Sequence, residues 1–215
     1  MALVLFVALA VGTGGAARQT PAGAAPPQGQ GARGGGRGPA PVNTLGAGPW
    51  DLGTGRSRVH VTLYAKDLDH PWGLAFLPDP STPLGAGGLT MLVTERPGRL
   101  RVIRNGVLDP TPIGPLPAML ARSLGGLLDV SLHPRFAENR LIYLTYSKPG
   151  TEENSATTAV YRARWDGGST LADGKDILVA NAYHGGPGSD QSMGPATGSY
   201  GSRIAWDKNG LMYVT

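Results

Sequence analysis

Hydrophobic and polar residues alternate with a period of two in several short segments of the chain. The clearest are residues 128–132 and 142–146, where leucine, valine, isoleucine and tyrosine alternate with other residues. A period of two predicts β-strands. The connection between them contains Pro134 and Asn139, which favour turn conformations, so the two segments are predicted to form an antiparallel pair.

The same strand–turn–strand pattern occurs three times. The copies can be aligned on Phe76, Leu132 and Trp206, and a separate alternating segment, residues 59–64, precedes the first copy. No long stretch has the 3.6-residue spacing of an amphipathic helix. The chain is therefore predicted to be all-β, and repeated four-strand units of this size are typical of β-propeller blades. A β-sandwich with coincidentally similar strand pairs stays open as an alternative.

A propeller ring typically has about four to eight blades. The 215 residues contain only enough strands for about the first two to three. We therefore expect the sequence to be the N-terminal piece of a longer protein.

The first 57 residues differ in composition from the rest. Residues 1–11 are almost entirely apolar and are followed by small residues up to Ala17, which predicts a signal peptide over residues 1–17. The run is shorter than the about 20 apolar residues of a membrane span, although an uncleaved anchor stays open because no basic residues precede it. Residues 18–57 are rich in glycine, proline and alanine and are predicted to be a disordered linker, which leaves 58–215 as the globular part.

The composition excludes several classes of binding site and catalytic mechanism. The formal net charge of +4 comes partly from arginines of the linker, where no aromatic residues alternate with them, so no nucleic-acid partner is predicted. The absence of cysteine excludes disulfides, thiolate nucleophiles and zinc–cysteine sites. Phosphate-binding loops and nucleophile elbows are also absent from the sequence. Together with the signal peptide, these features predict a periplasmic or secreted protein.

Four motifs occur in order along the globular part: HPWGLAFLPD at 70–79, LVTERPGRL at 92–100, GGLLDV at 125–130 and GSRI at 201–204. With these motifs the chain, from about residue 58 to its end, resembles the PQQ-dependent sugar dehydrogenases, the soluble glucose/sorbosone and aldose sugar dehydrogenase family. The resemblance implies an exported six-bladed propeller that binds pyrroloquinoline quinone (PQQ) and Ca²⁺. It also implies oxidation of a small-molecule sugar at C1, by hydride transfer to the quinone with a histidine as general base, and an external electron acceptor.

The catalytic base is where the chain departs from this family. The pattern His-x-Gly-x-Arg corresponds here to residues 199–203, so Ser199 stands at the position of the base. A serine hydroxyl without a proton-accepting partner is not a usable general base near neutral pH. The polar loop before it contains His184, which is a candidate for a displaced base and otherwise a solvated loop histidine.

The resemblance also suggests a substrate pocket formed by Leu124, Gly125, Gly126 and Tyr200. Leu124 stands where the family often has glutamine, and its side chain cannot hydrogen-bond a sugar hydroxyl. The two glycines are expected to let the backbone approach the channel mouth. Arg203 is a candidate for binding a carboxylate of the cofactor, with a structural hydrogen-bonding role as the alternative. The family's quinone and calcium ligands lie mainly beyond Thr215, so no metal ligand is assigned.

Other conspicuous residues are interpreted as structural. Glu95 and Arg96 are expected to form an ion pair at a turn, and Trp72 and Trp206 to pack between blades. The sequence thus favours a PQQ-dependent sugar oxidoreductase, inactive as this fragment alone. A non-catalytic propeller that binds carbohydrate or a partner is the alternative because of Ser199, and a quinoprotein of altered specificity is a third possibility.

Overall fold

The computed structural model describes the following residues: 2–9, 48–53, 55, 57–78, 89–183, 185 and 200–215. Nearly all the regular structure in them is β, which confirms the predicted all-β class. The chain forms two compact units. One consists of Met1–Val4 with Tyr64–Thr215, and the other of Leu5–Leu63.

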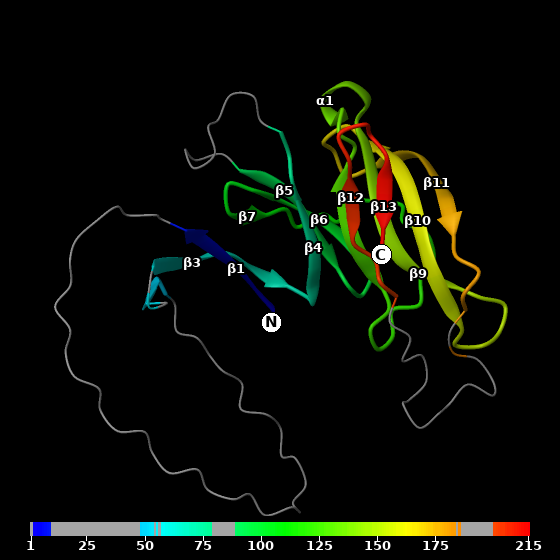
Figure 1. Ribbon diagram of the computed structural model, residues 1–215, viewed down its shortest axis with the longest axis horizontal. Coiled ribbons are helices and arrows are strands. Elements are labelled where there is room, and N and C mark those ends of the chain that lie inside the picture. Colours follow the sequence, from blue (N-terminus) through cyan, green and yellow to red (C-terminus); the bar gives the residue numbers. More distant parts are fainter. Residues whose placement is uncertain are drawn as a thin grey trace, which may run out of the picture. The chain divides into compact units, whose positions relative to one another are not determined.

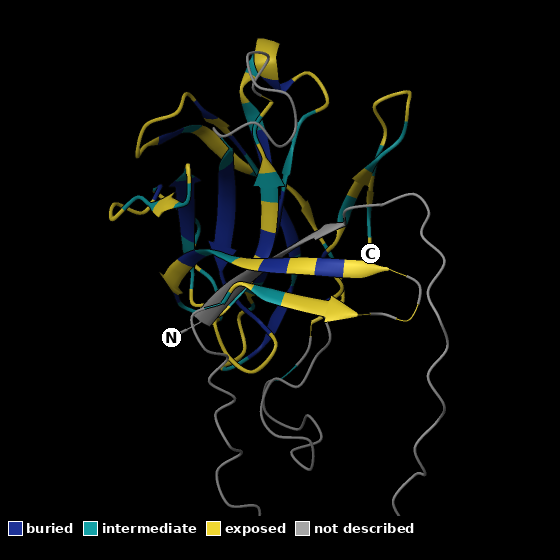
Figure 2. Ribbon diagram, turned by 90° about the vertical axis from the view of Figure 1, so that its left-hand side faces the viewer, coloured by how far each residue is buried: buried dark blue, intermediate teal, exposed yellow. Residues whose placement is uncertain are grey.

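A three-stranded sheet is organised by one long strand. β3 (Arg58–Leu68) lies between β1 (Ala2–Leu9) and β2 (Trp50–Gly53), and it pairs antiparallel with β2. β2 and the part of β3 up to Leu63 belong to the smaller unit. Val59 and Val61 are buried while His60 and Thr62 are exposed, as expected for a strand with one buried face (Figure 2).

The larger unit contains two four-stranded antiparallel sheets in which each strand pairs with the next (Figure 1). The strands of the first sheet are β4 (Pro71–Phe76), β5 (Thr90–Glu95), β6 (Arg99–Arg104) and β7 (Val107–Leu108). Those of the second are β8 (Leu127–Leu132), β9 (Leu141–Pro149), β10 (Ala156–Trp165) and β11 (Leu171–Val179). A hairpin of β12 (Ile204–Trp206) and β13 (Met212–Val214) follows.

The connection between β8 and β9, predicted as a plain turn, contains a short helix. α1 (Phe136–Asn139) buries Phe136 and ends at Arg140, whose backbone is left-handed with φ 56° and whose N–H donates to the Phe136 carbonyl. His133 stabilises the start of this connection, since its Nδ1 accepts the backbone N–H of Arg135 at 3.0 Å.

The two sheets share one hydrophobic core. Residues of the first sheet, among them Leu92 and Val102, belong to the same buried cluster as Leu127, Leu144 and Trp165 of the second (Figure 2). The first strands are neighbours, because β4 contacts β8 and β8 contacts β12 (Figure 1). Successive four-stranded meanders that pack face to face, with their first strands innermost, are propeller blades. The described residues thus form two blades and the first hairpin of a third, as predicted.

A threonine on the second strand of the first blade bridges it to the second blade. The Oγ1 atom of Thr94 accepts the backbone N–H of Gly73 on β4 at 2.8 Å and donates to the Leu128 carbonyl on β8. One buried hydroxyl therefore satisfies the backbone groups of two first strands. A hydrogen bond of this kind contributes about 0.5–1.5 kcal/mol net.

The second blade repeats this bridge at the equivalent positions. Thr145 Oγ1 accepts the N–H of Asp129 at 2.9 Å and donates to the carbonyl of Ser202, in the segment that leads into β12, at 2.9 Å. The blades are thus related by side-chain contacts as well as by strand order.

Glu95 is paired, but not with its neighbour in sequence. Its carboxylate, fully buried, accepts Arg99 Nε at 2.6 Å and Arg101 Nη1 at 3.2 Å. Arg96 instead donates to the carbonyls of Ser123 and Gly125. The prediction of a Glu95–Arg96 pair was therefore wrong. Glu95 lies directly opposite Arg99 in the β5–β6 register, whereas successive residues of a chain in extended conformation point to opposite sides.

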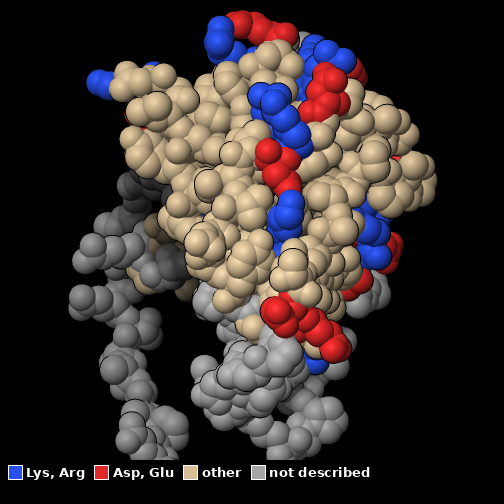
Figure 3. All heavy atoms as spheres, turned by 90° about the vertical axis from the view of Figure 1, so that its right-hand side faces the viewer, with Lys and Arg blue, Asp and Glu red and all other residues tan. Residues whose placement is uncertain are grey.

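Charged side chains of both signs are interspersed on the side where β11 lies (Figure 3). Two ion pairs connect strands there: Lys148 of β9 pairs with Asp176 of β11 across the intervening β10, and Arg164 of β10 pairs with Asp173 of the neighbouring β11 at 3.6 Å. These cations therefore each have a partner within their own sheet. An exposed pair such as Arg164–Asp173 contributes about 0–1 kcal/mol.

Candidate functional site

A pocket of about 240 Å³ opens near the entrances to the first strands of the blades. Among the described residues, it is lined by Trp72, Leu124, Leu128, Tyr200 and Gly201. The volume lies just below the about 300–1,000 Å³ of typical small-molecule sites.

The order of the strands explains why these residues meet. In an antiparallel meander the start of the first strand, the turn from second to third strand and the end of the fourth lie at one edge of the sheet. Trp72 and Leu128 are each the second residue of a first strand, and Tyr200 and Gly201 come shortly before β12. The pocket is therefore built from three successive blades at the same edge.

The wall of the pocket is mainly apolar. Leu124 and Trp72 are 49% and 40% exposed, whereas Leu128 and Tyr200 are almost completely buried. The Tyr200 carbonyl accepts the Thr158 hydroxyl at 2.6 Å, which holds this part of the chain against β10. Burial raises the pKa of the Tyr200 phenol, so the group stays protonated near neutral pH. Such a wall suits a planar ring or the apolar face of a sugar.

Gly125 and Gly126 are buried and are not among the residues that line the pocket. A Cβ atom on Gly125 would lie 2.8 Å from the Leu120 carbonyl oxygen, and one on Gly126 only 2.0 Å from the Arg96 carbonyl oxygen. Both glycines thus allow close packing of backbone behind Leu124. They position the loop that carries the pocket wall.

Three residues occupy equivalent positions at the innermost strands of the three blades. The strand pairs Leu74–Val93, Val130–Leu144 and Ile204–Val214 align the three hairpins. The residues that precede Leu74, Val130 and Ile204 therefore correspond to one another: Gly73, Asp129 and Arg203. A Cβ on Gly73 would lie 2.7 Å from Asp129 Oδ1, and this same oxygen accepts Arg203 Nη1 at 3.0 Å. The missing side chain at Gly73 therefore makes room for the Asp129–Arg203 ion pair.

Replacing Gly73 by alanine is expected to lower the free energy of unfolding by about 1–3 kcal/mol, the usual cost of overpacking. The new Cβ would also lie 3.0 Å from the Leu128 carbonyl, so moving the Asp129 side chain alone cannot relieve the contact. Denaturant unfolding measures the change. Gly53→Ala is the control, because no atom lies within 4 Å of a Cβ there. Equal stability of both variants would contradict the close approach.

The remaining predicted residues have different outcomes. Ser199 and His184 lie outside the described residues, so their roles stay predictions. Trp206 packs between blades as expected, since its indole N–H donates to Ser131 Oγ at 2.9 Å and its ring meets Tyr143 edge-on. Trp72 lines the pocket instead, because Gly73 occupies the buried side of β4 and its neighbour points outward.

Within the described part of the chain, no three histidine or carboxylate side chains converge as a metal site would require. In that same part, no helix has the length and apolar character needed to cross a membrane.

The sequence prediction did not include Leu128, Gly201 or Asp129 in the site. The signal for Asp129 was present in the repeats, since aligning Phe76, Leu132 and Trp206 also aligns Gly73, Asp129 and Arg203. Leu128 and Gly201 carried no such signal, because only the approach of the blades brings them to the pocket.

The fold and this pocket define a partial β-propeller with an apolar pocket at the edge where the innermost strands begin. The chain belongs to the glucose/sorbosone dehydrogenase family, which matches residues 68–215. The resemblance of its motifs to this family is confirmed.

Two relatives and one crystal structure illustrate the similarity. The chain is 42% identical over 148 residues to the uncharacterized protein slr1608 of Synechocystis sp., covering 65% of this chain and 30% of that protein. It is 33% identical over 157 residues to the aldose sugar dehydrogenase YliI of Escherichia coli (strain K12), covering 73% and 37%. The crystal structure of the soluble aldose sugar dehydrogenase from Escherichia coli is 35% identical, with a TM-score of 0.55 over 68% of this chain and 37% of that one. The chain thus spans about a third of the length of these relatives.

Proposed function

We propose that the protein is an exported, PQQ-dependent sugar oxidoreductase that oxidises an aldose or related sugar at C1 and passes the electrons to an external acceptor. Family membership supports the reaction class. The observation that carries the proposal is the Arg203 guanidinium, which is anchored on one side by Asp129 while its side chain is 65% exposed, close in sequence to the apolar pocket residues.

The residues of the site fit such a cofactor. PQQ is a planar quinone with carboxylate groups, and it accepts a hydride when bound. Arg203 offers the charged, planar donor that carboxylates prefer. Trp72, Leu124 and Leu128 offer an apolar wall for a flat ring or for the apolar face of a sugar. Calcium, an oxygen-binding cation, belongs to the same proposal, with ligands that we do not assign to described residues.

Reconstitution tests the proposal directly. The protein, expressed with any further coding sequence of its gene, is loaded with PQQ and Ca²⁺ and assayed for dye reduction with a panel of aldoses and polyols. We expect sugar-dependent reduction that is lost when the quinone is omitted. Sugar binding by calorimetry without quinone binding would instead favour the non-catalytic carbohydrate-binding alternative.

Substitutions at Ser199 and His184 identify the base. If His184 is the general base, His184→Ala should lower kcat by about a hundredfold and Ser199→Ala should change it little. If this loop contains no general base, Ser199→His should raise kcat by about tenfold or more, because an imidazole near its ordinary pKa accepts the proton. The pH dependence of kcat, measured for each variant, checks that the imidazole titrates with the activity.

Export is proposed from residues 1–17. When the gene is expressed in a bacterium with its own N-terminus, the mature protein is expected in the periplasmic or culture fraction and to begin near Arg18. N-terminal sequencing gives the cleavage site. A cytoplasmic protein that still begins at Met1 would contradict this.

A further inference from the structure

We propose that Asp129 is a positioning residue that presents Arg203 to an anionic group, a carboxylate of the bound quinone. This inference rests on the proposed function. It gives a functional role to an aspartate that the alternating pattern of the strand does not distinguish from other polar strand residues.

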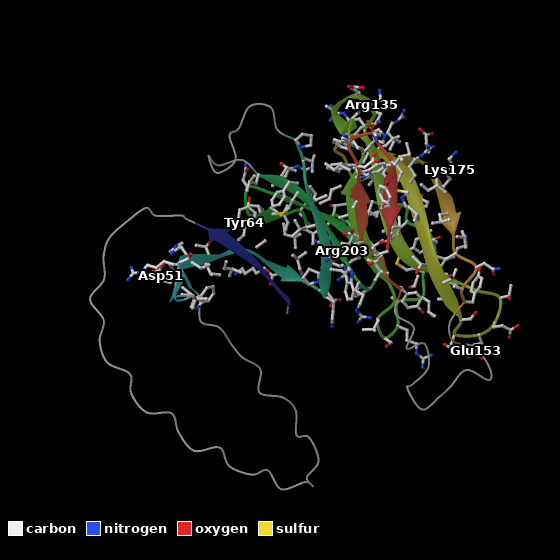
Figure 4. All side chains as sticks on the ribbon, viewed as in Figure 1. Asp51, Tyr64, Arg135, Glu153, Lys175 and Arg203 are labelled. Carbon is white, nitrogen blue, oxygen red and sulfur yellow. The ribbon has the colours of Figure 1, made fainter. Side chains whose placement is uncertain are left out.

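Both oxygens of the Asp129 carboxylate accept hydrogen bonds from within the protein. Oδ1 accepts Arg203 Nη1 at 3.0 Å, and Oδ2 accepts the backbone N–H of Ile204 at 2.9 Å. The side chain is only 7% exposed, whereas that of Arg203 is 65% exposed. Asp129 is therefore fixed, and it fixes one end of an arginine that otherwise reaches into solvent at the start of β12 (Figure 4).

The backbone on both sides of Asp129 and Arg203 is held as well. Thr145 accepts the Asp129 N–H and donates to the Ser202 carbonyl, so the same threonine ties the two residues' strands together. Gly73 leaves the space that the carboxylate fills. The Asp129 end of the ion pair is thus held among residues of three blades, whereas the Arg203 end is exposed.

Positioning matters for an arginine because ordering a free arginine side chain costs up to about 2 kcal/mol of rotamer entropy. Asp129 orders the guanidinium through Nη1 before any ligand arrives. Among the described residues, Asp129 is the one hydrogen-bond partner recorded for that group, so its other N–H groups can bind a carboxylate. A preorganised donor binds more tightly for this reason.

The negative charge of Asp129 weakens the binding of an anion, since it offsets the positive charge of Arg203. Each of its oxygens already accepts a hydrogen bond, and the backbone N–H of Ile204 stabilises the negative charge in addition to Arg203. We therefore expect positioning to exceed repulsion. The two effects predict opposite changes in affinity when Asp129 becomes asparagine, which makes the sign of the change decisive.

The experiment measures PQQ affinity by fluorescence quenching and calorimetry, independently of turnover, in a double-mutant cycle of Asp129→Asn and Arg203→Ala. Asparagine keeps an acceptor for the Ile204 N–H and loses the charge that holds Arg203. We expect each single variant to weaken binding by about tenfold, the value of one well-placed charged hydrogen bond. The double variant should bind no more weakly than Arg203→Ala alone, because Asp129 acts through Arg203.

Thr157→Val is the matched control. It removes a buried threonine hydroxyl of the second blade that donates to the carbonyls of Ala180 and Ala182, and this hydroxyl hydrogen-bonds neither Asp129 nor Arg203. It should lower stability and leave PQQ affinity within about twofold. Asp129→Ser, which also keeps a small acceptor, replaces Asp129→Asn if circular dichroism shows that the asparagine variant does not fold.

Three results overturn the inference. Additive losses in the double variant would mean that Asp129 acts through the fold alone, and unchanged or tighter binding in Asp129→Asn would mean that it does not position Arg203. Absence of quinone binding by the unsubstituted protein would overturn the proposed function itself and the inference with it, so the two failures are distinguishable.

Discussion

Replacing Glu95 by glutamine is expected to lower the free energy of unfolding by about 3 kcal/mol, the lower end of the range for breaking a buried ion pair. The Glu95 side chain is fully buried and accepts Arg99, Arg101 and the backbone N–H of Asp69. Glutamine keeps one acceptor oxygen but turns an amide N–H₂ toward a cation. Arg101, itself almost fully buried, is then left without its carboxylate, whereas the partly exposed Arg99 is rescued by water.

The same carboxylate predicts how stability depends on pH. Burial alone would raise the pKa of Glu95, but the hydrogen bonds from Arg99, the Asp69 backbone and Arg101 outweigh burial and hold the pKa below the ordinary value of 4.5. A group whose pKa is lowered in the folded state contributes stability that is present above its unfolded value. That contribution is lost as the pH falls through the folded pKa. The unsubstituted protein should therefore lose stability in acid below about pH 4.5 more steeply than Glu95→Gln.

Denaturant unfolding at neutral and acid pH measures both effects. Glu138→Gln is the matched control, since Glu138 pairs with Arg135 at 3.5 Å while both side chains are about 70% exposed. Exposed pairs of this kind contribute less than about 1 kcal/mol. If Glu95→Gln and Glu138→Gln behaved alike, the Glu95 cluster would not stabilise the first blade.

The strands themselves could be predicted from the sequence because each lies in a window of local alternation. Residues 128–132 and 142–146 fall within β8 and β9. What alternation could not predict is the burial of the polar members. Asp129 and Thr145 are buried because they bond the next blade, and the period of a strand does not distinguish a face turned to solvent from one turned to a neighbouring blade.

The site was predictable only where a motif or a repeat identified it. Leu124 and Tyr200 came from the motif resemblance, and both line the pocket. Leu128 joins them only because two blades approach each other, a contact between residues far apart in the sequence. The pairing of Glu95 depends in the same way on the β5–β6 register, which sequence proximity to Arg96 obscured.

Gly126→Ala is expected to cost about 4 kcal/mol of unfolding free energy, because two separate costs add there. The backbone of Gly126 has φ +138°, a conformation that residues other than glycine rarely adopt, and such strain costs about 1–3 kcal/mol. The added Cβ would also lie 2.0 Å from the Arg96 carbonyl oxygen, and overpacking costs about another 1–3 kcal/mol. The contact is with backbone, so no side-chain rotation relieves it.

The clash must displace either the β5–β6 turn or the loop that carries Leu124. The Arg96 carbonyl accepts the Leu127 N–H at 3.0 Å, so either displacement weakens this hydrogen bond. The Gly126 N–H donates to Ser147 Oγ at 2.7 Å, so displacing the loop breaks this second hydrogen bond as well. Gly168→Ala is the control, since no atom lies within 4 Å of a Cβ there and its φ is not positive; it should change stability by less than about 1 kcal/mol. Unfolding measurements on the two variants give the loss of stability, and titration with PQQ gives the loss of binding at the pocket. Under the proposed function, Gly126→Ala should lose quinone affinity along with stability, because the loop that it displaces forms one wall of the pocket.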